Sequence, residues 1–455
     1  MKKTVLLVVF AASMQVLSAQ TVGELAAGYL RDLIRLDTSN PPGNESKVAN
    51  YLKQVADREG IPAELLGPDA QRLNFVARLR GSGKQRPLLL MAHSDVVPVD
   101  RSQWTVDGFA AVEKDGFLYG RGAEDDKSLL AAELAVVVEL KRRKTPLDRD
   151  IILVSEADEE SGATGARWLI DNAWAKMDAE FALNEFATIL ETAGGAPVFQ
   201  IQTAEKVPTR IRLTAHGVAG HGSLPREDNP VYHLSRAIVR LTEAAQPVQL
   251  NTTTRTYFRE LTRLPDFAAM GPLVAQLEDP AKAESAAAAL QKANAELGAM
   301  LHMSISPTML NAGMRINVIP NTAEAQLDGR RMPGETMDEV FARLRKIVDD
   351  PAVTVEPAET VVYPPTEPSS LTTPLYLAMA SVFRESNPKA LVVPFLMRAT
   401  TDGAWLRAKG MAVYGVPLFR TEGASRMHGN DERIGLDNLR HGAELLEKIV
   451  LKVAQ

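Results

Sequence analysis

The first part of the chain alternates between helical and extended hydrophobic patterns. Apolar residues recur at helical spacing over residues 22–36 and 48–59, and residues 129–140 form a strongly apolar helix. Short, mostly apolar runs of strand length accompany these helices. The predicted strands are residues 74–79, 87–92, 151–154 and 180–183. Such alternation is typical of a mostly parallel sheet with helices on both faces, so we expect an α/β protein.

In the middle of the chain the pattern changes to strict alternation of apolar and polar residues. This alternation covers residues 209–215 and 321–330 and predicts strands with one buried and one exposed face. An amphipathic helix follows each strand, at residues 231–244 and 335–350, and residues 353–357 form a further predicted strand. We expect these elements to form a smaller, two-layer α+β domain.

We expect this smaller domain to be inserted into the larger one. The expected parts are a signal peptide (1–19), a first catalytic segment (20–206), the inserted lid or dimerisation domain (207–363) and a second catalytic segment (364–455). The alanine-rich residues 280–300 predict one helix. In the last segment we expect strands at residues 391–397 and 411–414, and a helix at residues 437–453 with Asp437 as its N-cap.

Composition narrows the classes of function. The 455 residues are 45% hydrophobic and 24% charged, as in an ordinary globular protein that can bury full cores. The net charge of −6 and the mixed signs along the chain argue against nucleic-acid binding, which favours basic patches. Because the chain has no cysteine, any zinc must be held by histidine and carboxylate.

The first residues resemble a secretory signal peptide. Lys2 and Lys3 precede a mostly apolar run at residues 4–17, and residues 18–20 offer a small-residue cleavage point. A membrane anchor is the alternative, but the run is shorter than the roughly 20 residues that a spanning helix needs. We therefore expect an exported protein, periplasmic or secreted, with no stable membrane insertion after cleavage.

Acidic residues and histidines follow several of the predicted strands. His93 and Asp95 follow the second strand, Glu159 and Glu160 the third, and Glu185 the fourth. In open α/β sheets ligands bind beyond the carboxyl ends of the strands, where these side chains would converge. Two adjacent glutamates at the end of a buried strand are energetically unfavourable unless they bind a cation or exchange a proton there.

Two further segments add to this set. Asp125 and Asp126 lie in a glycine-containing loop before the third helix, and His428 supplies a late imidazole. Each residue alone has an ordinary alternative: a histidine beside a strand is commonly structural, and an aspartate pair commonly caps a helix, as Asp126 could. Their recurrence after successive buried strands favours a metal site.

Three segments together resemble the zinc-dependent aminoacylase and carboxypeptidase family. They are residues 93–98, 120–127 and 158–162, and the resemblance spans essentially the whole mature chain. The family includes acetylornithine deacetylase, succinyl-diaminopimelate desuccinylase and glutamate carboxypeptidase. Between the first two segments the sequence is most similar to the Gly-Xaa carboxypeptidase and fatty-acyl amino-acid hydrolase branch.

The resemblance implies two zinc ions, with cobalt or manganese as substitutes. It implies that Asp125 bridges both ions, that His93 and Glu185 bind the first, and that Glu160 and His428 bind the second. The pair of ions would polarise the scissile carbonyl and activate a water molecule.

The remaining roles implied by the resemblance concern catalysis. Glu159 would be the general base, and Asp95 would accept the second ring N–H of His93. His221 would stabilise the oxyanion; in dimeric relatives it comes from the neighbouring subunit, so a homodimer is one expectation. Asn317 and Arg330 would bind the substrate carboxylate, with a solvated strand arginine as the alternative for Arg330. The other histidines are expected to be structural or exposed: His216, His233, His302 and His441.

The leading prediction is a hydrolase that cleaves an amide bond next to a free carboxylate, in a small peptide or an N-acyl amino acid. One alternative is a dinuclear zinc aminopeptidase of another family, which would lack the inserted domain with His221. Another is a non-catalytic relative, which would have lost metal ligands.

Overall fold

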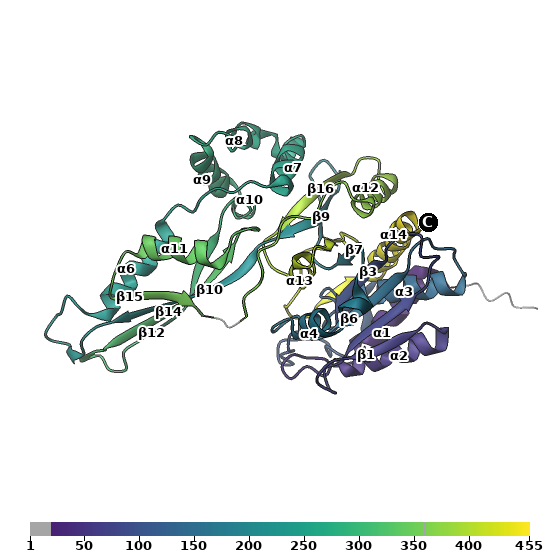
Figure 1. The fold of residues 1–455 in the computed structure, drawn as a ribbon, viewed down its shortest axis with the longest axis horizontal. Coiled ribbons are helices and arrows are strands. Elements are labelled where there is room, and N and C mark those ends of the chain that lie inside the picture. The colour runs from purple at the N-terminus through teal and green to yellow at the C-terminus, as the bar shows by residue number, and fades with distance from the viewer. Residues whose placement is uncertain (1–19, 359–360) are drawn as a thin grey trace, which may run out of the picture.

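The computed structural model describes residues 20–358 and 361–455, so the predicted signal peptide lies outside the described residues. Figure 1 shows two parts along the long axis of the molecule: a larger one around strands β3, β6 and β7, and a smaller one around β10, β12 and β14. None of the helices in the described ranges has the length and apolar character needed to cross a bilayer.

A nine-stranded sheet forms the larger part. Its order is β1-β2-β6-β3-β7-β17-β9-β16, with β8 paired to β9. The strands are β1 (Ala63–Leu66), β2 (Asn74–Leu79), β3 (Leu88–His93), β6 (Ile151–Glu156), β7 (Phe181–Asn184), β8 (Thr188–Leu190), β9 (Val198–Glu205), β16 (Leu391–Met397) and β17 (Ala412–Gly415). The central strands β6, β3, β7 and β17 run parallel. This confirms the predicted α/β class with a mostly parallel central sheet.

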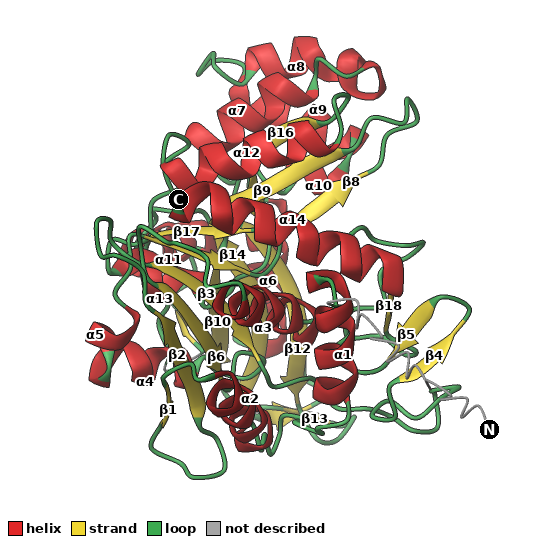
Figure 2. Ribbon diagram, turned by 90° about the vertical axis from the view of Figure 1, so that its right-hand side faces the viewer, coloured by secondary structure: helices red, strands yellow, loops and turns green. Residues whose placement is uncertain are grey.

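Helices cover both faces of this sheet because its side chains alternate between two cores. Leu88 and Leu90 of β3 face one core, whereas Leu89 and Met91 face the other. Figure 2 shows the helices of the first face grouped on one side of the sheet. They are α1 (Val22–Ile34), α2 (Ser46–Glu59), α3 (Lys127–Arg142), α12 (Pro374–Ser386) and α14 (Leu436–Ala454). The second face carries α4 (Thr164–Asn172), α5 (Trp174–Met177) and α13 (Gly403–Ala408).

The smaller part is a four-stranded antiparallel sheet in the order β12-β14-β10-β15. Its elements are β10 (Val207–His216), β12 (Ser304–Ala312), β14 (Thr322–Arg331), β15 (Val353–Pro357), α6 (Pro230–Glu243) and α11 (Met337–Val348). Buried residues alternate along β10 and β14 as predicted, and the buried face packs against α6 and α11. Beyond one end of β10 and β14, β11 (Gly220–His221) pairs with β13 (Val318–Ile319).

Further helices lie within the same stretch of sequence but pack against the large sheet. These are α7 (Thr252–Leu261), η1 (Pro265–Met270), α8 (Gly271–Gln276), α9 (Ala283–Ala293) and α10 (Ala295–Gly298). They share a hydrophobic core with Val198 of β9 and Phe395 of β16. The division into domains at residues 206 and 363 therefore stays a prediction, because this stretch contributes to both parts.

Two local predictions were wrong. The single helix predicted for residues 280–300 is two helices, because the Asn294 backbone is extended and its side chain accepts hydrogen bonds from Glu296 and Leu297 N–H. The last helix begins at Leu436 with Gly435 as its N-cap, and Asp437 lies in the first turn.

The remaining small sheet consists of β4 (Val112–Lys114), β5 (Phe117–Tyr119) and β18 (Arg433–Gly435).

Candidate metal centre

Five predicted side chains converge beyond the carboxyl ends of β3, β6 and β7. His93 ends β3, and its Nε2 lies 2.9 Å from Asp125 Oδ1 and 3.5 Å from Glu185 Oε2. His428 Nε2 lies 3.1 Å from Asp125 Oδ2 and 3.0 Å from Glu160 Oε1. The two oxygens of Asp125 thus face two different imidazoles, each of which is accompanied by one glutamate.

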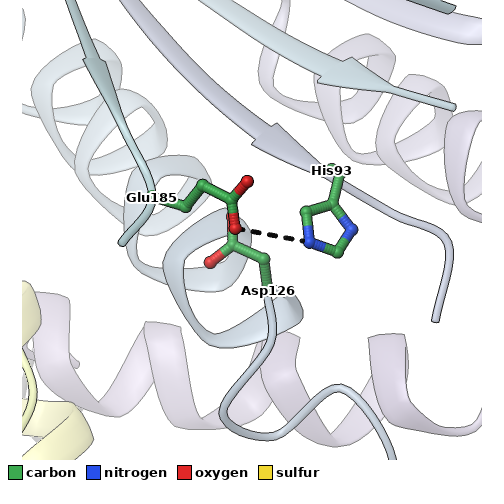
Figure 3. Close-up of side chains that lie close together, drawn as sticks. All are labelled: His93, Asp126 and Glu185. Atoms are coloured by element: carbon green, nitrogen blue, oxygen red, sulfur yellow. Dashed lines mark ion pairs between the residues drawn. The ribbon is translucent and has the colours of Figure 1, made fainter. Parts of the chain in front are cut away.

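Asp126 is a sixth member of this cluster that the sequence did not assign. Figure 3 shows its carboxylate beside His93 and Glu185, and ligand atoms of the three residues lie within 4.8 Å of one another. Asp126 occupies the N-cap position of α3, but its side chain makes no capping hydrogen bond. The suggestion that this side chain caps the helix is therefore wrong. The adjacent aspartates were the only sequence signal for it.

Burial makes this cluster of acids electrostatically unfavourable by itself. Burial raises the pKa of Glu185 to about 8, and the negative charge of Asp125 adds to the effect. Burial and then the charge of Glu185 raise the pKa of Asp126 and of Glu159 well above the ordinary range. His93 responds in the opposite sense: burial lowers its pKa, but the carboxylates of Glu185 and Asp125 outweigh burial and raise it.

A divalent cation fits this donor set. Asp126 Oδ2 and Glu185 Oε2 are buried and have no hydrogen-bond partner among the described residues. Such atoms are costly unless another group binds them. Imidazole nitrogen and carboxylate oxygen without thiolate are ligands that zinc accepts in catalytic sites, and cobalt and manganese accept the same atoms. Positive charge there would also relieve the repulsion among the carboxylates.

Asp95 is buried behind the cluster, and its backbone carbonyl oxygen is the atom nearest to the second ring nitrogen of His93. His93 Nδ1 lies 2.9 Å from the Asp95 carbonyl oxygen and 3.6 Å from its carboxylate Oδ1. The carboxylate instead accepts hydrogen bonds from the backbone N–H groups of Glu159 and Glu160, at 3.1 and 3.2 Å. It also accepts one from Asn40 Nδ2 at 2.7 Å. Asp95 therefore fixes the turn that carries both glutamates.

Glu159 and Arg330 line one cleft between the two parts of the molecule, together with Glu160 and His428. Glu159 is half-buried and lies beside the cluster without belonging to the hydrogen-bonded set around Asp125. Arg330 projects from the polar face of β14, and its Nε lies 3.1 Å from Asp328 Oδ1. The structure thus brings Arg330 to the same cleft as the cluster.

His221 and Asn317 lie elsewhere. Both are exposed, and neither lines the cleft. Arg330 lies at the end of β14 next to the large sheet, whereas Thr322 begins the strand at its far end (Figure 1). Eight residue steps at about 3.3 Å each separate these ends by about 26 Å. His221 and Asn317 follow beyond the far end, where the Gly222 N–H donates to the Asn317 carbonyl oxygen at 2.8 Å.

Glu432 is a positioning residue that sequence reasoning missed. Its carboxylate is fully buried and accepts hydrogen bonds from the backbone N–H groups of Gly122, Glu124 and Asp125, at 3.1, 2.7 and 3.2 Å. The Arg121 guanidinium donates a further bond at 2.6 Å. Glu432 therefore fixes the loop that carries Asp125. Its place four residues after His428 was the available signal.

Glu124 completes the arrangement from the opposite side. Its carboxylate accepts hydrogen bonds from Arg426 N–H at 3.0 Å and from Ser425 Oγ at 2.7 Å. These residues belong to the loop that carries His428. Two glutamates thus join the Asp125 loop and the His428 loop reciprocally, although about 300 residues separate them in sequence. We call this pair of contacts the loop clasp.

The fold and the cluster define a metal-dependent hydrolase in which two imidazoles share one carboxylate. Residues 89–452 match the model of peptidase family M20/M25/M40, and the chain belongs to this family. The match confirms the predicted resemblance and does not support an aminopeptidase of another family.

Individual relatives agree with this placement. The chain is 28% identical over 366 residues to the N-fatty-acyl-amino acid synthase/hydrolase of Homo sapiens, covering 77% of this chain and 71% of that protein. It is 25% identical over 431 residues to aminoacylase-1A of Rattus norvegicus, covering 93% and 94%. Its fold is similar to that of the M20 metallo-carboxypeptidase Sso-CP2 from Sulfolobus solfataricus, with a TM-score of 0.71 and 20% identity over 94% of this chain and 99% of that one.

Replacing Glu432 with glutamine should weaken metal binding. The amide would present N–H groups to the backbone donors that now bind the carboxylate, so the Asp125 loop would shift. Changes of this kind behind metal ligands lower metal affinity by about 10–100-fold. Competition with a chelator measures the affinity, and Glu284→Gln on the exposed face of α9 is the matched control. Unchanged affinity in a folded Glu432→Gln protein would contradict the positioning role.

Proposed function

We propose that the protein is a dinuclear zinc hydrolase that cleaves an amide bond next to a free carboxylate. The observation that carries the proposal is Asp125, whose two oxygens each face a different imidazole. In this proposal His93 and Glu185 hold one ion, Glu160 and His428 hold the other, and Asp125 contributes one oxygen to each. Asp126, beside His93 and Glu185, would offer a further carboxylate to the first site.

When bound, the two ions supply Lewis-acid polarisation of the scissile carbonyl and lower the pKa of water. Glu159 then takes the proton of the attacking water and passes it to the leaving nitrogen. Two features suit Glu159 to this task. It is half-buried at the cleft wall, and burial together with Glu185 raises its pKa toward the range in which a carboxylate can both accept and return a proton.

The contacts of Asp95 are consistent with different roles for the two glutamates, Glu159 as general base and Glu160 as metal ligand. Its two carboxylate oxygens accept the N–H groups of Glu159 and Glu160 separately, Oδ1 from the first and Oδ2 from the second. The backbone of both residues is therefore fixed. Glu160 is then directed to His428, while Glu159 stays available to the substrate in the cleft.

The substrate carboxylate is proposed to bind at Arg330. This guanidinium faces the cleft and shares Asp328 with Arg210, which also lines the cleft. The planar fork of arginine suits bidentate pairing with a carboxylate. A small peptide and an N-acyl amino acid both offer such a group, and the human relative named for N-fatty-acyl-amino acids favours the latter.

His221 is proposed to reach the cleft of a second copy of this chain in a homodimer. Within one chain, His221 lies too far from Arg330 and the cleft to contact an oxyanion formed there. The surface around His221 supports association, because Met314 and Ile316 are almost fully exposed and β12 is an unpaired edge of its sheet. An isologous contact through this surface would bring His221 and Asn317 toward the partner cleft.

Export remains part of the proposal. It is supported by the basic and apolar pattern of the first residues, which lie outside the described part of the chain. N-terminal sequencing of the mature protein should find a start near Gln20; a chain that retains Met1 would contradict export.

The roles of the adjacent glutamates can be separated. Glu159→Ala should retain both metals and bind substrate while kcat falls about 10²–10⁴-fold, the range for a general base. Glu160→Ala should instead lose affinity for one ion and recover part of its activity at high zinc. Metal titration and steady-state kinetics on both variants distinguish the roles. If only the Glu159→Ala variant lost metal, the roles assigned to the two glutamates would be reversed.

Arg330 should make the enzyme selective for free carboxylates. Substrates with an amidated C-terminus are expected to be cleaved slowly, and Arg330→Ala should raise KM for the free acid much more than for the amide. Kinetics with matched acid and amide substrates measure this difference. Equal rates for both in the unmodified enzyme would show that the cleft does not select a carboxylate.

Catalysis across subunits should be visible by mixing two inactive variants. Glu159→Ala and His221→Ala each disable every site of their own homodimers. In a hybrid dimer, one site combines a native Glu159 with a native His221, so random exchange should restore about a quarter of the sites. Activity measured after mixing and subunit exchange tests this. No recovery in confirmed hybrid dimers would place His221 outside the partner site.

A further inference from the structure

The turn that carries both glutamates, residues 158–163, is held by two buried carboxylates, those of Asp95 and Asp158. Asp95 binds the N–H groups in the middle of the turn. Asp158 begins the turn, and its carbonyl oxygen accepts the N–H groups of Gly162 and Ala163 at 3.0 and 2.6 Å. The backbone path around the glutamates therefore depends on how these two aspartates lie.

The Asn40 side chain joins the two aspartates. Its Nδ2 lies 2.7 Å from Asp95 Oδ2 and 2.9 Å from Asp158 Oδ1. Ionised carboxylates only accept hydrogen bonds, so the amide nitrogen of Asn40, which has two N–H groups, donates one to each. Asn40 is only 6% exposed. Without its amide, two buried negative charges would lie together with no shared donor, which is unfavourable.

Asn40 is itself fixed by the segment that carries Asp95. Its backbone N–H donates to the Val96 carbonyl oxygen at 2.8 Å, and the Val96 N–H donates to the Thr38 carbonyl oxygen at 3.2 Å. The Thr38 hydroxyl donates to the Ser94 carbonyl oxygen at 2.6 Å. These bonds leave the Asn40 amide little freedom to move away from the two aspartates.

Two further donors hold Asp158. The Arg72 guanidinium donates to Oδ1 at 2.8 Å, and the Thr164 hydroxyl donates to Oδ2 at 2.5 Å. The Asp158 backbone has a φ of +71°, in the left-handed region, which a residue other than glycine keeps only when surrounding contacts maintain it. The three donors to its side chain, with that of Asn40 among them, are such contacts.

The two glutamates depend on this turn to different degrees. The Glu160 side chain has a contact of its own, because its Oε1 lies 3.0 Å from His428 Nε2. No donor within residues 20–358 and 361–455 binds the Glu159 carboxylate. The position of that carboxylate in the cleft therefore depends on the backbone of the turn.

We propose that Asn40 is a positioning residue for Glu159. The inference rests on the proposed function, in which Glu159 is the general base. By joining Asp95 to Asp158, the Asn40 amide sets the direction in which the Glu159 side chain leaves the turn. A misplacement of about 1 Å at reacting groups can lower a rate about 100-fold. Loss of the amide should therefore lower kcat, whereas substrate binding at Arg330 does not depend on it.

A double-mutant cycle between Asn40 and Glu159 tests the inference with the zinc-loaded protein. Asn40→Ala should lower kcat about 100-fold and leave KM and zinc content nearly unchanged. In the Glu159→Ala background the same substitution should change kcat by less than about twofold, because no base remains to be positioned. Thr164→Val removes another donor to Asp158 and nearly keeps the side-chain shape. It should lower kcat in the same manner but less, and it replaces Asn40→Ala in the cycle if that variant does not fold.

Asn172→Ala is the matched control, because it removes an equal amide from the exposed end of α4, where Nδ2 donates to the Trp168 carbonyl oxygen at 2.9 Å. Circular dichroism verifies that each variant is folded. The same factor of kcat loss with and without Glu159, or unchanged kcat in the folded variants, would overturn the inference and leave the proposed function intact. Full kcat in Glu159→Ala would overturn the general-base role and the inference with it.

Discussion

Repulsion among buried carboxylates at one edge of the nine-stranded sheet is the constraint on which the site depends. Burial alone would raise the pKa of Asp125, yet the facing imidazoles of His428 and His93 outweigh burial and hold its pKa well below the ordinary range. For Glu185 and Asp126 burial outweighs the attraction of His93, and the pKa of both groups is raised. The protein keeps this unfavourable arrangement at the point where parallel strands end. A bound cation would give a physical reason for keeping it.

The loop clasp explains how residues far apart in sequence form one precise centre. Asp125 and His428 lie on different loops, and neither loop is part of a strand or helix that could fix it alone. Glu432 binds the backbone of the first loop, and Glu124 binds the second. The chain between them contains the whole smaller sheet and the helices α7 to α10. The clasp therefore joins the two loops directly, across this large intervening part of the chain.

Much of this architecture could be predicted because its signals are local or periodic. The apolar runs of β3 and β6 and the alternation in β10 and β14 follow directly from whether one or both faces of a strand are buried. Three members of the cluster could be proposed for a related reason, because His93, Glu160 and Glu185 lie at or just after a strand end. Other features depend on tertiary packing that no local pattern specifies. The helices α7 to α10 have amphipathic patterns that do not reveal which sheet they cover.

The same limit applies within the site. A sequence shows that Asp95 is near His93, but only the backbone path determines that the carbonyl oxygen meets the imidazole while the carboxylate binds the glutamate turn. In the sequence Asp126 resembles a helix cap, but the path of its loop places the side chain in the cluster. The role of Glu432 depends on contacts between segments about 300 residues apart, which periodicity cannot show. The position of His221 far from the cleft likewise depends on strand length and register.

The central claim is that Asp125 joins two cations. Anomalous diffraction from crystals of the zinc-loaded protein, recorded on both sides of the zinc absorption edge, tests it most directly. The account predicts two peaks on either side of the Asp125 carboxylate, about 3.5–4 Å apart, one beside His93 and one beside His428. A single peak in fully active protein, or two peaks that do not share Asp125, would contradict it.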